Sequence, residues 1–180
     1  MRAVNRTITA AILLSGLAAV ASPGQSMTDE ELIRQATSAA PPGVAAEASV
    51  MAPTEAGGLR MLREGSNTFT CLPATPDLGF PAMCLDANGL AWFRARRAGV
   101  RPMPGMVGFG YALTGCASGC SLGVAAGEAP NSVGGRSFVM IMNLPRPAID
   151  HMWSRGKEGL TQPQVVLQDT HYEYLMIPVQ

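Results

Sequence analysis

The stretch RSFVMIMNL, residues 136–144, decides the fold of this chain. Its apolar residues follow one another and do not alternate with polar ones, as they would in a strand with one solvent-facing side. Successive side chains of a strand point to opposite faces of the sheet, so this run predicts a central strand covered on both faces.

Weaker strand signals lie on both sides of this run. A strand that contains several glycines is predicted at residues 105–113, GMVGFGYAL. The last strand is predicted at residues 172–179, YEYLMIPV. Nearer the N-terminus, residues 59–63 and 68–72 flank a Gly-Ser-Asn turn at residues 65–67, a pattern that indicates a β-hairpin.

Three helices are expected, each from its own local signal. Thr28 and Glu31 form a capping box, so a helix begins there and ends at the following Pro-Pro-Gly sequence. Asp86 is a capping residue for a second helix, which Gly99 ends. Residues 148–153 predict a third, short helix.

These elements mix without a regular β-α-β rhythm. The sequence therefore predicts an α+β fold: a single small domain with a mainly antiparallel sheet, two or three short helices and two disulfides.

The N-terminus has the order of a secretory signal peptide. Arg2 and Arg6 are basic, residues 8–20 are apolar, and Ala19-Val20-Ala21 places small residues before a cleavage site after Ala21. The alternative is an uncleaved anchor, but the apolar run is shorter than the roughly 20 residues of a spanning helix. We expect residues 1–21 to be a signal peptide, and the mature chain to have no transmembrane segment.

The remaining chain divides into an N-terminal helical arm, residues 22–43, and one α+β domain, residues 44–180. The full sequence has 13 basic and 13 acidic residues. Because this charge is balanced, nucleic acid is not expected as the main partner.

The expected export decides how the four cysteines are interpreted. They are Cys71, Cys84, Cys116 and Cys120. In an oxidising compartment two disulfides are more common than a metal site. Three pairings are possible, and local pairing of Cys71 with Cys84 and of Cys116 with Cys120 is the simplest.

Several motifs together carry a family resemblance. FTCLPATPDLGFPAMCLD, a tryptophan-containing helix, VGFGYAL, FVMIMNLP and YLMIPV resemble a family of uncharacterised exported bacterial proteins over roughly residues 60–179. That family has no assigned activity, so the resemblance implies export and identifies no catalytic residue.

Ser121 raises the possibility of catalysis. It lies in a G-x-S-x-G pattern and precedes Asp150, Asp169 and His171, which is the residue order of α/β-hydrolases. Such a serine needs a helix directly after it, and the glycine-rich residues 122–131 disfavour a helix. We expect a disulfide-closed surface loop here, with Ser121, Asp169 and His171 as an alternative catalytic set.

Methionine and arginine form two further clusters. Met103 with Met106, and Met140 with Met142, have soft sulfur atoms that suit Cu(I), although methionine also fills apolar cores. Arginine is concentrated in one helix and the residues after it, where it would bind an anionic head group or cell-wall polymer or form a solvated face. These arginines are Arg94, Arg96, Arg97 and Arg101.

The function predicted first is a non-catalytic binding or interaction module, exported to the periplasm or secreted, with no cofactor. Its partner would be an envelope component or another protein. A small secreted serine hydrolase and a periplasmic copper-binding protein are the alternatives.

Overall fold

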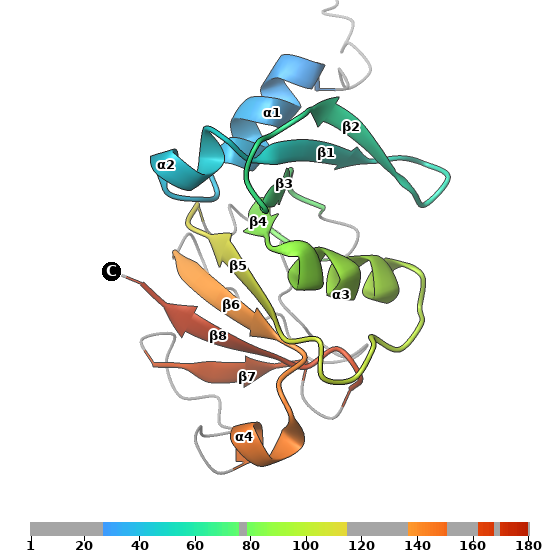
Figure 1. Ribbon diagram of the computed structural model, residues 1–180, viewed down its shortest axis with the longest axis vertical. Helices are drawn as coiled ribbons and strands as arrows, with labels where there is room; N and C mark the ends of the chain where they lie inside the picture. The colour runs from blue at the N-terminus through green and yellow to red at the C-terminus, as the bar shows by residue number, and fades with distance from the viewer. Residues whose placement is uncertain (1–26, 76–78, 115–136, 151–161, 168–169, 180) are drawn as a thin grey trace, which may run out of the picture.

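A computed structural model describes residues 27–75, 79–114, 137–150, 162–167 and 170–179. The elements are shown in Figure 1. They are α1 (Asp29–Thr37), α2 (Pro42–Ala45), β1 (Ser49–Pro53), β2 (Leu59–Arg63), β3 (Thr70–Leu72), β4 (Met83–Leu85), α3 (Ala87–Arg97), β5 (Gly108–Ala112), β6 (Phe138–Met142), α4 (Arg146–Asp150), β7 (Gln164–Val166) and β8 (Tyr174–Pro178).

The strands form one eight-stranded sheet in the order β2-β1-β3-β4-β5-β6-β8-β7. Every neighbouring pair is antiparallel except β1 and β3, which are parallel. The α+β class and the mainly antiparallel sheet are therefore confirmed. None of the helices in the described ranges is both long and apolar enough to cross a membrane.

The described residues contain four helices, one more than the upper number expected. The first begins at the capping box as expected, with Thr28 Oγ1 accepting from the Glu31 N–H and Glu31 Oε2 accepting from the Thr28 N–H. It ends at Thr37, and the Pro-Pro-Gly sequence then starts α2, with Pro42 in the first turn. Proline favours this position because the first N–H groups of a helix have no partner within it.

The expected hairpin of residues 59–63 with residues 68–72 is wrong. β2 pairs with β1 instead, and β1 lies between β2 and β3. The turn that closes the β1–β2 hairpin contains Thr54, whose N–H donates to the Gly58 carbonyl over 2.9 Å. Between them, Gly57 has a φ of 84°, a conformation that favours glycine.

The Gly-Ser-Asn sequence at 65–67 forms a crossover in place of the expected turn. The N–H groups of Ser66 and Asn67 donate to the Glu47 carbonyl over 2.8 and 3.1 Å. A Cβ atom on Gly65 would lie 2.2 Å from the Ser49 nitrogen, so only glycine allows the chain to pass this close to β1. The crossover takes the chain past β1, and β3 then pairs with β1 on the side opposite β2.

The central position of β6 is confirmed, since β5 and β8 flank it. Its two faces differ. Phe138, Met140 and Met142 are fully buried, whereas Val139 and Ile141 on the opposite face are only partly buried.

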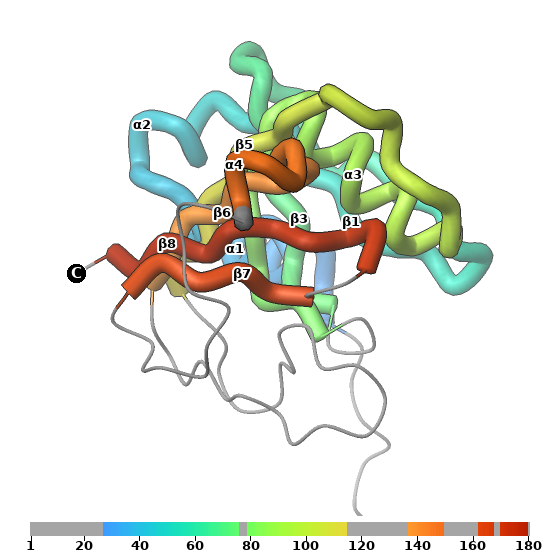
Figure 2. The backbone as a smooth tube through the Cα atoms, turned by 90° about the horizontal axis from the view of Figure 1, so that it is seen from below, coloured from blue at the N-terminus to red at the C-terminus, as the bar shows by residue number. Residues whose placement is uncertain are grey.

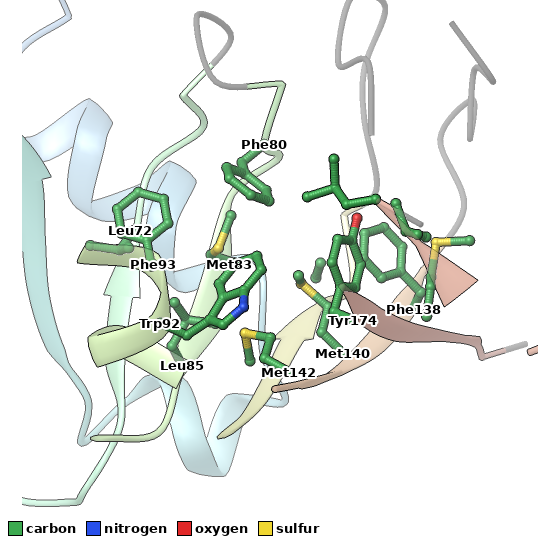
Figure 3. Close-up of a cluster of buried hydrophobic side chains, with 14 of the residues drawn as sticks. Leu72, Phe80, Met83, Leu85, Trp92, Phe93, Phe138, Met140, Met142 and Tyr174 are labelled. Atoms are coloured by element: carbon green, nitrogen blue, oxygen red, sulfur yellow. The ribbon is translucent and has the colours of Figure 1, made fainter. Parts of the chain in front are cut away.

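Two apolar clusters lie on opposite faces of the sheet. Alternation along the strands separates them, because Cys84 points to one face while its neighbours Met83 and Leu85 point to the other. The α3-side cluster (Figure 3) consists of Leu72, Phe80, Met83, Leu85, Leu90, Trp92, Phe93, Ala112, Phe138, Met140, Met142, Val166, Leu167, Tyr174 and Met176. The α1-side cluster consists of Ala36, Ala39, Ala40, Ala45, Ala48, Val50, Cys71, Ala82 and Cys84.

The helix expected as part of an N-terminal arm, α1, contacts β1, β2, β3 and β4. Its Ala36 is fully buried, and its Asp29 carboxylate accepts from the Arg60 guanidinium of β2, with Oδ2 3.0 Å from Nη1. That hydrogen bond holds the pKa of Asp29 below its usual range. The boundary at residue 43 stays a prediction.

The disulfide between Cys71 and Cys84 is confirmed. The two residues face each other across the antiparallel pair of β3 and β4, and both are fully buried under α1. Cys116, Cys120 and the expected signal peptide lie outside the described residues.

Candidate binding site

The start of α3 is attached to β5 by one capping side chain. Asp86 Oδ1 accepts from the Gly89 N–H over 2.7 Å, which caps the helix, and from the Phe109 N–H over 3.1 Å. The Asp86 N–H also donates to the Phe109 carbonyl. The expected cap is therefore confirmed, and it also fixes the helix on the sheet.

Two glycines let α3 lie directly on the strand. A Cβ atom on Gly108 would be 2.4 Å from the Gly89 nitrogen, and one on Gly89 would be 2.8 Å from Met142 Cε. This contact explains why the predicted strand at residues 105–113 is rich in glycine. It also places the Asn88, Ala91 and Trp92 side of α3 beside the chain that returns to β5.

That returning chain, residues 100–107, contains no helix or strand, yet side chains hold it at several points. Asn88 Nδ2 donates to the Val107 carbonyl over 2.9 Å. Asn143 Nδ2 donates to the carbonyls of Met103 and Met106 over 2.7 and 3.0 Å. Asn143 itself has a φ of 59°, a left-handed conformation in which asparagine is enriched.

A small pocket lies between α3 and this segment. Its volume is about 100 Å³, and it is lined by Asn88, Ala91, Trp92, Pro102, Met103, Met106 and Asn143. Pockets that hold drug-sized molecules or cofactors are usually about 300–1,000 Å³. The space therefore suits one apolar side chain or the end of one acyl chain.

The wall of this pocket is tightly packed. Trp92 is 1% exposed and packs edge to face against Phe80, Tyr172 and Tyr174, with ring centroids 5.8–6.4 Å apart. Its Nε1 is buried and has no hydrogen-bond partner among the described residues. Figure 3 shows the indole next to Met142.

The segment that borders the pocket has several exposed apolar side chains, which we call the apolar rim. It consists of Val100, Met103, Met106 and Val107, which are 54%, 71%, 42% and 38% exposed. Within the described ranges, only three other large apolar side chains are exposed to this degree, and they lie elsewhere. Figure 2 shows the segment at the periphery of the molecule, on the outer side of α3. A concentration of exposed apolar side chains in one segment is typical of an interaction site.

The four candidate methionines occupy two environments. Met103 and Met106 belong to the apolar rim, whereas Met140 and Met142 are fully buried in the α3-side cluster. Among the described residues there is no group of three or more His, Cys, Asp or Glu side chains suited to a metal ion. Copper binding by the methionines stays a prediction.

The candidate arginines also divide. Arg96 lies over the rings of Phe80 and Tyr172, with its Cζ 4.8 and 5.7 Å from their centroids, and burial lowers its pKa. Arg94 and Arg101 are exposed, and Arg97 is partly buried. We refer to Arg94, Arg97 and Arg101 as the outer arginines. Anion binding by the four stays a prediction, but Arg96 has a structural role.

The alternative catalytic set is described only in part. Ser121 and Asp169 lie outside the described residues. His171 is exposed in the turn before β8. The hydrolase alternative and the expected loop at residues 114–130 therefore stay predictions.

Reasoning from the sequence did not identify the pocket. Met103 and Met106 were expected either as sulfur ligands or as core residues, and Asn88 and Asn143 were not expected to have a role. A usable signal is present in the sequence Pro-Met-Pro-Gly-Met at 102–106. Apolar residues that alternate with proline and glycine cannot follow a helix or strand period, so no regular element can bury them.

Comparison with protein-family models, curated proteins and solved structures found no match.

Proposed function

We propose that this protein is an exported, non-catalytic binding module of the bacterial envelope. The observation that carries the proposal is the apolar rim above a pocket whose wall is Trp92. The signal-like N-terminus and the resemblance to exported proteins support the location. The buried disulfide supports it weakly, because disulfides persist in oxidising compartments.

The rigidity of the site favours binding. Asn88 and Asn143 hold the segment through its backbone carbonyls, so the apolar side chains are presented in a fixed arrangement. A surface that is already ordered loses little conformational entropy when a partner binds. Methionine side chains are flexible and polarisable, and they adapt to partners of different shape.

The size of the site limits what enters it. A pocket of about 100 Å³ accepts one apolar group, while the rim contacts the rest of the partner. The partner is therefore expected to be larger than the pocket and to insert a single apolar group.

The uncharged apolar dye N-phenyl-1-naphthylamine tests the site. Titration of exported protein should give a saturable rise in fluorescence with one site per chain. In spectra of the protein with ¹³C-labelled methionine methyl groups, the Met103 and Met106 signals should shift. The Met61 signal should stay unchanged, because this exposed methionine lies on β2.

Export is tested separately. The intact mass of the exported protein should match a chain that starts at Ser22, after removal of the signal peptide.

Two alanine variants provide the matched comparison. Ala91→Phe places a large side chain in the pocket from α3 and should abolish the fluorescence rise, whereas Ala46→Phe on an exposed position after α2 should leave it unchanged. Absence of saturable binding in the wild type, or equal binding by both variants, would contradict the proposed site.

A further inference from the structure

We infer that the apolar rim and the adjacent Arg101 dock this protein on a lipid surface that contains anionic phospholipid. The rim enters the headgroup region and Arg101 binds a lipid phosphate. The inference rests on the proposed function, because it names the partner of the same site.

Positive charge is concentrated in α3 and the rim segment. The whole chain is balanced, yet the sequence from Ala87 to Thr114 contains four arginines and no aspartate or glutamate. Arg96 of this set lies over two aromatic rings, whereas Arg101 is exposed within the rim segment. A local excess of positive charge beside an apolar surface is complementary to an anionic leaflet.

The arginines differ in their placement. Arg101 follows Val100 within the rim segment. Arg97 Nε donates to the Gly57 carbonyl over 3.4 Å, and Arg94 Nη2 lies 3.8 Å from Met51 Sδ, so these two belong to the side of α3 that faces the β1–β2 hairpin. Arg101 is therefore the arginine placed to bind a lipid phosphate beside the rim. Long arginine side chains can extend along apolar surface and keep the guanidinium at the headgroups.

The rim is exposed and uncharged, and its backbone is held in place. Met103 is 71% exposed, and the segment from Pro102 to Tyr111 contains no charged residue. Its backbone is held by Asn88 and Asn143, so insertion does not require the segment to fold first. The pocket behind it has room for the end of one acyl chain.

Co-sedimentation with vesicles tests this inference. Wild-type protein should sediment with vesicles of phosphatidylcholine and phosphatidylglycerol and stay in solution with phosphatidylcholine alone. Added salt should weaken binding, because it screens exposed charges. An arginine near an anionic surface strengthens binding about fivefold, so Arg101→Gln should weaken the partition by that factor.

Matched controls separate this surface from general charge and apolarity. Arg34→Gln, on an exposed position of α1, should leave the partition unchanged. Met103→Ser with Met106→Ser should reduce the partition about tenfold or more, from the loss of buried apolar area, and Met61→Ser should not. Each variant should keep the wild-type unfolding midpoint, which excludes a loss of folding.

The outcomes distinguish the two proposals. Dye binding without sedimentation on anionic vesicles overturns the lipid inference and leaves the proposed binding site intact. Loss of both refutes both. Equal binding to neutral and anionic vesicles also overturns the inference, as does an envelope protein that occupies the rim while vesicles do not.

Discussion

The two faces of the sheet are packed in different ways. On the α1 side, six of the nine buried residues are alanine, and two more form the disulfide. On the α3 side, the fifteen buried residues include five aromatic residues and four methionines, and only one alanine. The α1 side of the sheet is therefore packed mainly with small side chains, whereas the α3 side is packed mainly with large ones and α3 lies directly on β5 at Gly89 and Gly108.

This difference affects how each face responds to change. Small side chains leave little area to bury and little space to adjust, so the α1 side depends on close contact and on the covalent bond. Large aromatic and thioether side chains bury more area and repack more easily.

Trp92→Ala should have the largest effect. The indole is almost fully buried among Phe80, Tyr172 and Tyr174, and large-to-small changes of this kind cost about 3–5 kcal/mol in unfolding free energy. Urea denaturation followed by circular dichroism measures the loss. The adjacent exposed position is the control: Ala91→Ser should change stability little. A decrease in unfolding free energy below about 1 kcal/mol, well under the expected loss, would show that the α3 side does not depend on its aromatic residues.

Removal of the disulfide by Cys71→Ala with Cys84→Ala should be next in size. The bond joins residues separated by 13 positions, and closing a loop of this size contributes about 3 kcal/mol in the chain-entropy model. Thermal unfolding measures the effect. The companion variant Cys116→Ser with Cys120→Ser should lower the midpoint less, because the loop between those residues is shorter. An equal decrease in the unfolding midpoint of both double variants would show that the buried Cys71–Cys84 bond does not contribute the larger share of stability.

Ala36→Leu and Met140→Leu together sharpen the contrast at the smallest scale. Ala36 is fully buried, with its carbonyl oxygen 3.6 Å from Cys84 Sγ, so overpacking there should cost about 1–3 kcal/mol. Met140 is equally buried, but its replacement by leucine conserves volume and should cost less than about 1.5 kcal/mol. Chemical denaturation of the two variants decides the order. A greater loss from Met140→Leu would reverse the comparison.

Local signals in the sequence predicted a substantial part of the fold. The unbroken apolar run identified β6, the side chains of Thr28 and Asp86 marked the starts of α1 and α3, and Cys71 paired with its nearest cysteine. Each of these features depends on residues that are close together in the chain. A single sequence can therefore reveal them.

Features that depend on distant residues were missed or misinterpreted. The hairpin was wrong because the Gly-Ser-Asn sequence resembles a turn, while the glycine is needed for a close approach to Ser49. The candidate binding site was missed because Met103 becomes part of it only where Asn143, forty residues later, holds its carbonyl. No periodicity in the sequence reports such a contact.

The single parallel pair in the sheet affects how the protein opens locally. β1 and β3 share only two register pairs, Ser49 with Thr70 and Val50 with Cys71, and this short ladder joins the β1–β2 hairpin to the other six strands. α1 crosses the junction, because it contacts strands on both sides. Regions with few joining hydrogen bonds open before the whole protein unfolds. We therefore expect the amide hydrogens of the β1–β2 hairpin to exchange with solvent earlier than those of β5, β6 and β8, and we expect α1 to slow this opening because it contacts both sides of the junction.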